Sequence, residues 1–244
     1  MKFIAKPLLY SRAVLFSRAI ALAAILALTS TAALAADAAL NYLKAGQPDA
    51  AVLLAPPPLQ DSPEALADLD EVRAVYHAAG SNDQAAAYSE KSFTVFNFAE
   101  AAGPFFVESN LPTTAAFFEK VQKDAETVTD TGKDFFRRPR PYSTDPSLAN
   151  GRLEKSFSYP SGHSTESMVL ALVLADLLPE KHDAIIAHAR QMGWHRVQIA
   201  RHYPTDIFAG RTLALAIVRE LKKSPDFQRD FEAAKAELAA AQAK

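Results

Sequence analysis

Hydrophobic residues recur every three or four positions through most of the chain beyond residue 60. In the first such segment, Leu66, Leu69, Val72 and Val75 follow this period until Gly80. A spacing of three and four places these side chains on one face of a helix, which we predict over residues 62–80. The same period predicts further helices over residues 83–102, 113–128, 180–192, 205–223 and 226–242.

One segment, residues 164–178, is apolar on almost every side. From Met168 to Leu178 its only charged residue is Asp176, which is typical of a helix buried on most faces. With fifteen residues and with Glu166 among them, it is too short and too polar to span a bilayer. Alternation of period two is scarce elsewhere, and residues 129–160 are predicted as a loop. We therefore predict an all-α protein, a single-domain helical bundle around this segment.

The first 35 residues have the pattern of an export signal rather than of a fold. Four basic residues lie at or before position 18, residues 19–28 are nearly all apolar, and Ala33-Leu34-Ala35 offers a small-x-small cleavage pattern. We predict cleavage after Ala35, a signal peptide over residues 1–35, a domain over residues 36–244, and a periplasmic location. An uncleaved N-terminal anchor is the alternative.

Charge and cysteine content narrow the function classes. Without the four basic residues of the signal, 22 Lys and Arg remain against 28 Asp and Glu, a net charge of −6. Nucleic-acid binding is not expected from such a balance, although a few local cations can still bind a small anion. The chain has no cysteine, so thiol catalysis, Cys-ligated metals and disulfides are excluded. A homo-oligomer is left open.

The first candidate cluster is a basic stretch before the central segment, with Lys133 and Arg140 seven residues apart. Pro139 and Pro141 stiffen the chain around Arg140, so that less entropy is lost when an anion binds. Arg140 could hold two oxygens of a phosphate, and Lys133 could act as a point charge. A solvated basic loop is the alternative interpretation.

The second cluster is Ser161-Gly162-His163, at the predicted start of the central helix. Unpaired backbone N–H groups at a helix start favour anions, and Gly162 allows a ligand to approach the backbone closely. A histidine at this point could exchange a proton with the ligand near neutral pH. A capped helix with an incidental histidine would have the same sequence.

The third cluster is Arg196, His202 and Asp206. Asp206 lies four residues after His202, within reach of one imidazole nitrogen, which would leave the other nitrogen free to attack or to accept a proton. Pro204 makes a helix through His202 improbable, so we predict a helix start near residue 205. A surface arginine beside a buried His–Asp pair is the alternative.

Together the clusters supply three cations, a helix start, two histidines and a carboxylate, which suits phosphoryl transfer. Their order and spacing, Lys133-x6-Arg140-Pro141, then Pro160-Ser161-Gly162-His163, then Arg196-x5-His202-x3-Asp206, resemble the three-part signature of the type 2 phosphatidic acid phosphatase (PAP2) superfamily. Residues 53–58, "LLAPPP", resemble the N-terminal segment of the bacterial class A non-specific acid phosphatases. The resemblance thus covers nearly the whole chain after the signal.

The resemblance implies a helical bundle of the acid phosphatase type and a role for each motif residue. His202 would be the nucleophile that forms a phosphohistidine, oriented by Asp206, and His163 would be the acid and then the base. The phosphate would be bound by five residues: Lys133, Arg140, Ser161, Gly162 and Arg196. No metal or cofactor is implied, and vanadate is expected to bind as a phosphate analogue.

One position departs from the family pattern, because His195 stands where the family usually has serine. Ser158 and Tyr159 resemble the family's approach to the second motif, and with His195 they are candidates to line the site. The expected activity is hydrolysis of small phosphate monoesters without metal. A vanadium-dependent haloperoxidase, a lipid or polyprenyl phosphate phosphatase, and a non-catalytic anion-binding protein of the envelope are the alternatives.

Overall fold

The computed structural model describes residues 40–243, and all the regular secondary structure of this part of the chain is helical. The prediction of an all-α protein is therefore confirmed. The predicted signal peptide, residues 1–35, and its cleavage site lie outside the described residues and stay a prediction.

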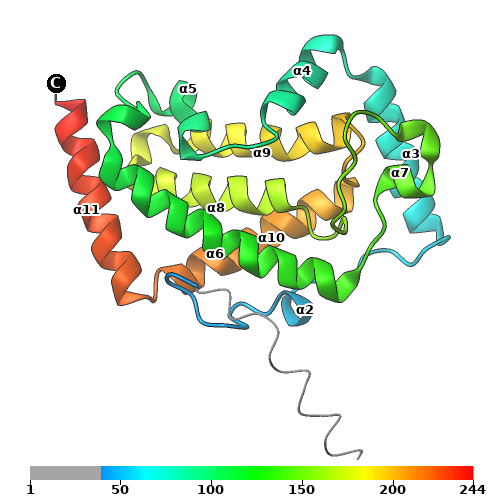
Figure 1. Ribbon diagram of the computed structural model, residues 1–244, viewed down its shortest axis with the longest axis horizontal. Coiled ribbons are helices and arrows are strands. Elements are labelled where there is room, and N and C mark those ends of the chain that lie inside the picture. Colours follow the sequence, from blue (N-terminus) through cyan, green and yellow to red (C-terminus); the bar gives the residue numbers. More distant parts are fainter. Residues whose placement is uncertain (1–39, 244) are drawn as a thin grey trace, which may run out of the picture. The chain divides into compact units, whose positions relative to one another are not determined.

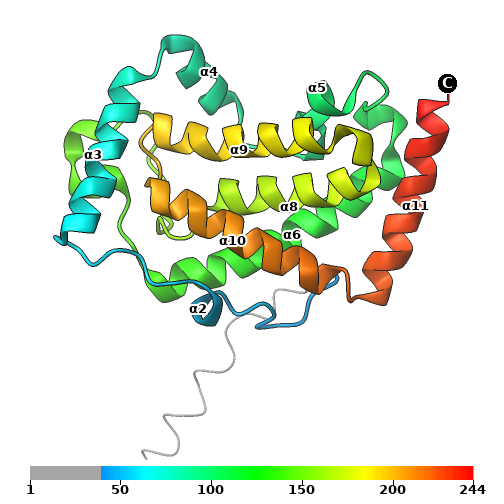
Figure 2. The same cartoon turned by 180° about the vertical axis from the view of Figure 1, so that it is seen from behind.

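Seven helices of nine or more residues form the described fold (Figures 1 and 2). They are α3 (Pro63–Ala78), α4 (Ser81–Ser89), α6 (Pro112–Phe136), α8 (Gly162–Leu177), α9 (His182–Gln198), α10 (Pro204–Leu221) and α11 (Pro225–Gln242). Shorter helical segments connect them: α2 (Ala50–Leu53), η1 (Val95–Phe98), α5 (Ala99–Ala102), η2 (Glu108–Asn110), α7 (Pro141–Thr144), η3 (Pro146–Leu148) and η4 (Pro179–Lys181).

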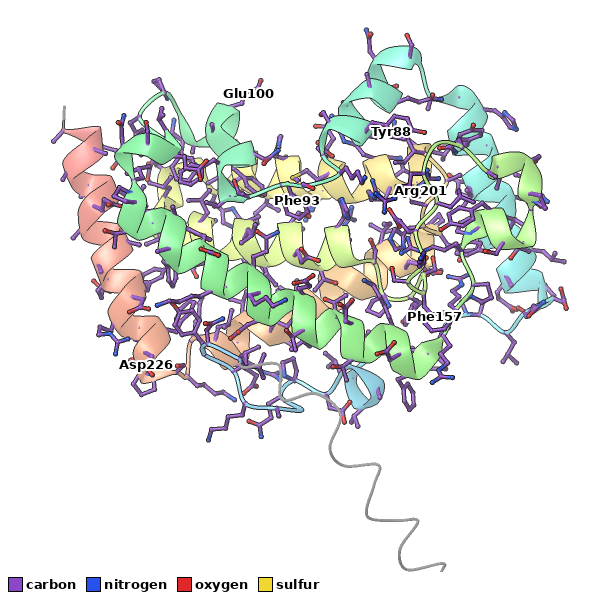
Figure 3. The ribbon with its side chains drawn as sticks, in the orientation of Figure 1. Tyr88, Phe93, Glu100, Phe157, Arg201 and Asp226 are labelled. Carbon is purple, nitrogen blue, oxygen red and sulfur yellow. The ribbon has the colours of Figure 1, made fainter. Side chains whose placement is uncertain are left out.

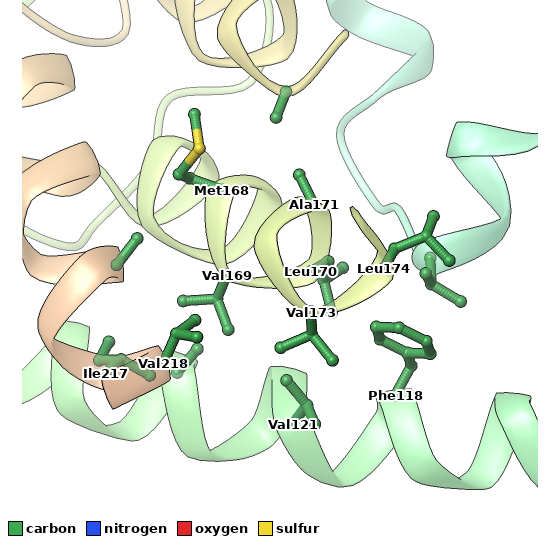
Figure 4. Packing of buried hydrophobic residues seen from close by; sticks show 14 of the residues in the cluster. Phe118, Val121, Met168, Val169, Leu170, Ala171, Val173, Leu174, Ile217 and Val218 are labelled. Atoms are coloured by element: carbon green, nitrogen blue, oxygen red, sulfur yellow. The ribbon is translucent and has the colours of Figure 1, made fainter. Parts of the chain in front are cut away.

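The central helix is α8, as the apolar pattern predicted, and it packs against α6, α9 and α10 (Figures 1 and 2). Val169, Leu170, Val173 and Leu174 have no exposed surface. Figure 4 shows how they interlock with Val121 and Phe118 of α6 and with the end of α10. Burial on every side removes most of the apolar surface of α8 from water and fixes the position of its N-terminus.

The predicted helix over residues 83–102 was wrong in its middle. Helix α4 ends at Ser89, residues 90–94 are not helical, and a 3₁₀ turn then leads into α5. Tertiary contacts outweigh helix propensity here, because the side chain of Glu90 contacts His195 and Phe93 is buried in the main core. The hydroxyl of Thr94 also accepts the N–H of Phe96 and so begins the 3₁₀ turn.

The predicted loop over residues 129–160 was also partly wrong, because α6 continues to Phe136. The hydroxyls of Thr129 and Thr131 donate to carbonyls one turn earlier, and Gly132 lies so close to Pro160 that a Cβ there would be 3.1 Å from the proline ring. Helix α9 likewise continues beyond the predicted residue 192, to Gln198. These two extensions place Lys133 and Arg196 on helices rather than on loops.

Candidate active site

Four helix ends meet at one place in the described fold. The C-terminal ends of α6 and α9 bring Lys133 and Arg196, and the N-terminal ends of α8 and α10 bring His163 and Asp206. A cavity of about 350 Å³ lies there. It is lined by five of the predicted site residues, Lys133, Arg140, Gly162, His163 and His202. Phe93, labelled in Figure 3, lines the same cavity.

His202 lies in the loop between α9 and α10 and is buried. Its Nδ1 is 3.3 Å from Oδ2 of Asp206, and its Nε2 is 2.9 Å from Nη1 of Arg140. A carboxylate only accepts and a guanidinium only donates, so the proton is on Nδ1 and the lone pair is on Nε2. Burial and the charge of Arg140 hold the pKa of His202 well below its ordinary value. The ring is therefore neutral, and His202 is one of the residues that line the cavity.

Asp206 is held by donors on every side. Ser158 Oγ donates to its Oδ2 at 2.5 Å, the N–H of Tyr203 donates to the same oxygen at 2.9 Å, and Arg138 Nη1 donates to Oδ1 at 2.7 Å. Arg138 also contacts Asp68 at 2.7 Å. The side chain of Arg138 is buried, because two carboxylates pair with it.

His163 is in the first turn of α8, and its Nε2 lies 3.1 Å from the backbone carbonyl of Glu90. The carbonyl only accepts, so Nε2 carries a proton and Nδ1 remains for a ligand. Burial lowers the pKa of His163 to about 3, and the charges of Arg196, Lys133 and Arg140 add to this effect. A doubly negative ligand between these cations would oppose their effect and raise the pKa.

The two arginines share a partner that the sequence did not reveal. Glu154, in the segment before α8, places Oε2 2.6 Å from Arg140 Nη1 and Oε1 2.5 Å from Arg196 Nη2. Arg140 is further held by the carbonyls of Ser156 and Arg201. The carboxylate thus joins two of the three predicted phosphate-binding cations.

Lys133 and Gly162 lie side by side at the start of α8. A Cβ at Gly162 would be 3.2 Å from Lys133 Nζ and 3.2 Å from Glu166 Oε1, so a larger residue would crowd both groups. Lys133 pairs with Asp130 at 2.9 Å. Ser161 is the N-cap of α8, and its hydroxyl accepts the N–H of Ser164 at 3.3 Å. Its side chain therefore acts on the helix start.

The three candidates for lining the site contact other groups. Ser158 donates to Asp206, as described above, and Tyr159 donates from its hydroxyl to the carbonyl of Ala55 at 2.6 Å. His195 is buried, with Nδ1 2.8 Å from Oε2 of Glu90. Since the carbonyl of Glu90 contacts His163, His195 acts on the site through Glu90 rather than directly.

Sequence reasoning missed Glu90, Glu154 and Glu166. Glu166 lies four residues after Gly162, so helical spacing alone could have placed it beside the cavity. Glu90 and Glu154 come from irregular segments, where no periodicity shows which way a side chain points. The sequence held no signal for either contact.

Neither a metal-binding group nor a membrane-spanning helix occurs within residues 40–243. No group of three or more His, Asp or Glu side chains there is placed to hold a metal ion. No described helix combines the length and the hydrophobicity that crossing a membrane requires.

The chain is similar in sequence to known phosphatases. Residues 122–229 match the PAP2 superfamily. A non-specific acid phosphatase from Providencia stuartii is 32% identical over 211 residues, which cover 82% of this chain and 85% of the relative. An acid phosphatase from Zymomonas mobilis is 29% identical over 199 residues, which cover 78% of this chain and 75% of the relative. Among solved structures, a transmembrane PAP2-type phosphatidylglycerolphosphate phosphatase from Bacillus subtilis matches 71% of this chain and 89% of its own, at 20% identity and a TM-score of 0.49. The chain belongs to the PAP2 superfamily, in the same family as the bacterial non-specific acid phosphatases.

Proposed function

We propose that the protein is a phosphomonoesterase that hydrolyses small phosphate esters through a phosphohistidine on His202, without a metal ion. One observation carries the proposal: His202 lines the cavity with a neutral imidazole whose Nδ1 contacts Asp206 and whose Nε2 carries a lone pair that accepts from Arg140. A purely anion-binding site would gain nothing from a neutral, oriented imidazole among its cations.

In the first step, His202 Nε2 attacks the phosphorus and the bond to the ester oxygen breaks. Arg140 donates to Nε2 in the free protein, so its N–H must pass from the imidazole to a phosphate oxygen as the substrate binds. Protonated His163 gives its Nδ1 proton to the leaving oxygen, so the products of this step are an alcohol and phosphohistidine.

In the second step, His163 is neutral and its Nδ1 takes a proton from water. The hydroxide that forms attacks phosphorus, the P–N bond breaks, and inorganic phosphate leaves with His202 neutral again. Lys133, Arg140, Arg196 and the N–H groups at the start of α8 bind the phosphoryl oxygens in both steps.

The charges of the substrate make His163 an acid. In the free protein the pKa of His163 is about 3, because burial and three cations disfavour imidazolium. A phosphate dianion pairs with the same cations, so the substrate itself raises that pKa toward the working pH. Activity is therefore expected to be highest at acidic to near-neutral pH.

Several finer features belong to the same proposal. The nucleotides and sugar phosphates of the cell envelope are the suggested substrates, class A is the suggested group of acid phosphatases, and the periplasm is the suggested location. Vanadate would bind as a phosphate analogue. The proposal requires no cofactor.

The test is hydrolysis of p-nitrophenyl phosphate in EDTA from pH 4 to pH 8, with His202→Ala as the comparison. Rapid acid-free quenching with labelled substrate should trap phosphate on histidine, recognised by its stability in alkali. Activity that requires added metal, or that persists in His202→Ala, would contradict the proposed mechanism.

A further inference from the structure

Glu154 occupies the place at which a phosphate would bind the two arginines. Each of its carboxylate oxygens contacts a different guanidinium, at 2.6 Å from Arg140 and 2.5 Å from Arg196. Two oxygens of one anion shared between two arginines is also the arrangement that a bound phosphate favours. Glu154 therefore acts as an internal anion in the clamp formed by Arg140 and Arg196.

Arg196 depends on this contact. Its side chain is 2% exposed, and within residues 40–243 Glu154 is the only group that accepts a hydrogen bond from it, while its Nε has no partner. A buried guanidinium without an anion is costly, so Arg196 requires either Glu154 or a ligand. Burial alone would raise the pKa of Glu154, but the charges of Arg140 and Arg196 outweigh it and hold that pKa below its ordinary value.

Glu154 lies at the border of two cavities. His163 and His202 line the first, and Arg196 lines the second, which has a volume of about 740 Å³. Lys91, Glu154 and Ser156 line both cavities. Tyr88 and Arg201, labelled in Figure 3, border the second one. A phosphoryl group that contacts both arginines and His202 would overlap the carboxylate of Glu154.

Glu154 is free to leave. Its side chain is 30% exposed, against 5% and 2% for the two arginines, and it lies in a segment without helix or strand. The two arginines are held more firmly, since Arg140 donates to backbone carbonyls and the side chain of Arg196 is enclosed by the protein around it. An entering anion therefore meets a preformed clamp from which only the carboxylate has to move.

We infer that Glu154 is a specificity-determining residue, which competes for the clamp and thereby selects phosphate monoester dianions over singly charged anions. The inference rests on the proposed function. A phosphodiester or a sulfate ester brings one negative charge, as the carboxylate does, and gains little by replacing it. A monoester brings a charge of about −2 at neutral pH and a third free oxygen, so it replaces the carboxylate favourably.

The test compares Glu154→Gln with Glu126→Gln, and it measures binding separately from turnover. Glu126 is an exposed residue that lines the same cavity, pairs with Lys123 and contacts neither arginine, so its substitution removes an equal charge. Binding of inorganic phosphate is measured by calorimetry at pH 7, and kcat/KM is measured for p-nitrophenyl phosphate and for bis-p-nitrophenyl phosphate. Glu154→Ala is measured as a second variant, and thermal melting confirms that each variant is folded.

We expect Glu154→Gln to bind phosphate about tenfold more tightly and to increase kcat/KM for the diester more than for the monoester. Glu126→Gln should change phosphate binding less than about twofold. Weaker phosphate binding in both Glu154 variants would show that the carboxylate holds the arginines in place, and would overturn the inference. Equal tightening in Glu126→Gln would overturn it too, in favour of a general effect of charge.

The proposed function can fail separately. A wild-type protein that binds phosphate but does not hydrolyse either ester would contradict the proposed function, while the binding comparison would still be decisive for Glu154. Conversely, the wild type could be active while Glu154→Gln binds phosphate as the wild type does. That result would support the proposed function and overturn the inference about Glu154.

Discussion

Oδ2 of Asp206 lies 3.3 Å from Nδ1 of His202, and this one contact fixes which nitrogen of the imidazole can react. The two residues are four positions apart but not in one continuous helix, because α10 begins at Pro204 between them. Asp206 is in the first turn of α10, where Ser158, Tyr203 and Arg138 all donate to it. The proposed nucleophile, His202, is therefore oriented by a carboxylate that is itself held by three donors.

Replacing His202 and replacing Asp206 should have different consequences. His202→Ala should reduce kcat by at least about 10⁴-fold, as removal of a covalent nucleophile does, with little change in phosphate binding. Asp206→Asn should also reduce kcat, and it should lower the melting temperature, because buried Arg138 loses one of its two carboxylate partners. Kinetics and thermal melting on both variants check this. Equal melting temperatures would show that Asp206 serves the histidine alone.

The effect of replacing His163 should depend on the leaving group. His163→Ala should reduce the rate for an alkyl phosphate by about 10²-fold to 10⁴-fold, because the alkoxide then leaves without a proton. The loss for p-nitrophenyl phosphate should be smaller, since p-nitrophenolate leaves readily. Rates with a series of leaving groups measure this. Equal losses for all esters would mean that His163 acts only in the second step.

Proton uptake offers a second test of His163. Its pKa is about 3 in the free protein, and phosphate binding should raise that pKa. Free phosphate is mostly a monoanion near pH 5 and can itself release a proton on binding, so the proton number is compared between two proteins. Calorimetric titration with phosphate near pH 5, in buffers of different ionisation enthalpy, should show proton uptake by the wild type relative to His163→Ala. The uptake should be smaller in His163→Ala. Identical uptake in the two proteins would place the proton elsewhere.

Local sequence patterns predicted most of the helices. The helix ends that were mispredicted depend on tertiary contacts. The period of apolar residues identified α3, α8, α10 and α11, whose starts carry Ser, Gly or Pro. The end of α6 was missed because its last turns are rich in Thr and Gly, which are poor helix formers. Packing of Gly132 against Pro160 and Ala50 stabilises that end, and such a contact cannot be read from neighbouring residues.

The residues of the site were likewise predicted only in part. Motif spacing was enough to bring together Lys133, Arg140, Gly162, His163 and His202, because each motif is attached to a helix end. Three carboxylates around the site, by contrast, come from elsewhere in the chain: Asp68 from α3, Glu90 from the residue after α4, and Glu154 from an irregular segment. Pairing across such distances depends on the whole fold, so single motifs do not predict it.

The buried pairs of Arg138 should matter far more to stability than exposed pairs do. Arg138 lies between Asp68 and Asp206 at 2.7 Å from each, and its guanidinium stacks 3.7 Å from the ring centre of Tyr203. Arg138→Ala should lower the free energy of unfolding by about 3 to 5 kcal/mol, since two buried carboxylates would lose their cation. Denaturant unfolding measures this. Lys123→Ala, which breaks an exposed pair with Glu126, is the control and should change stability little.

Glu166 should make both stability and activity depend on pH near neutrality. Burial raises its pKa to about 7, Gln122 and Lys133 oppose this, and Glu126 and Asp130 add to it. In the unfolded chain the same carboxyl titrates near its ordinary value of 4.5. Between these values the folded protein keeps a proton that the unfolded chain has lost, so the free energy of unfolding falls as the pH rises from about 4.5 to about 7.

Glu166→Gln removes this titration because the amide is neutral at every pH. The variant should gain stability over the wild type progressively through that window, with the full difference present above pH 7. Ionised Glu166 also lies near Lys133, so the KM of the wild type for p-nitrophenyl phosphate should rise above pH 7 more steeply than that of the variant. Melting temperatures and KM from pH 4.5 to pH 8.5 measure both effects, with Glu100→Gln as the control for a carboxylate that is already exposed. Parallel curves for wild type and Glu166→Gln would show that Glu166 is ionised across the whole range. Lys133 would then have a negatively charged neighbour at every pH measured. Any loss of activity at alkaline pH would have to come from the histidines.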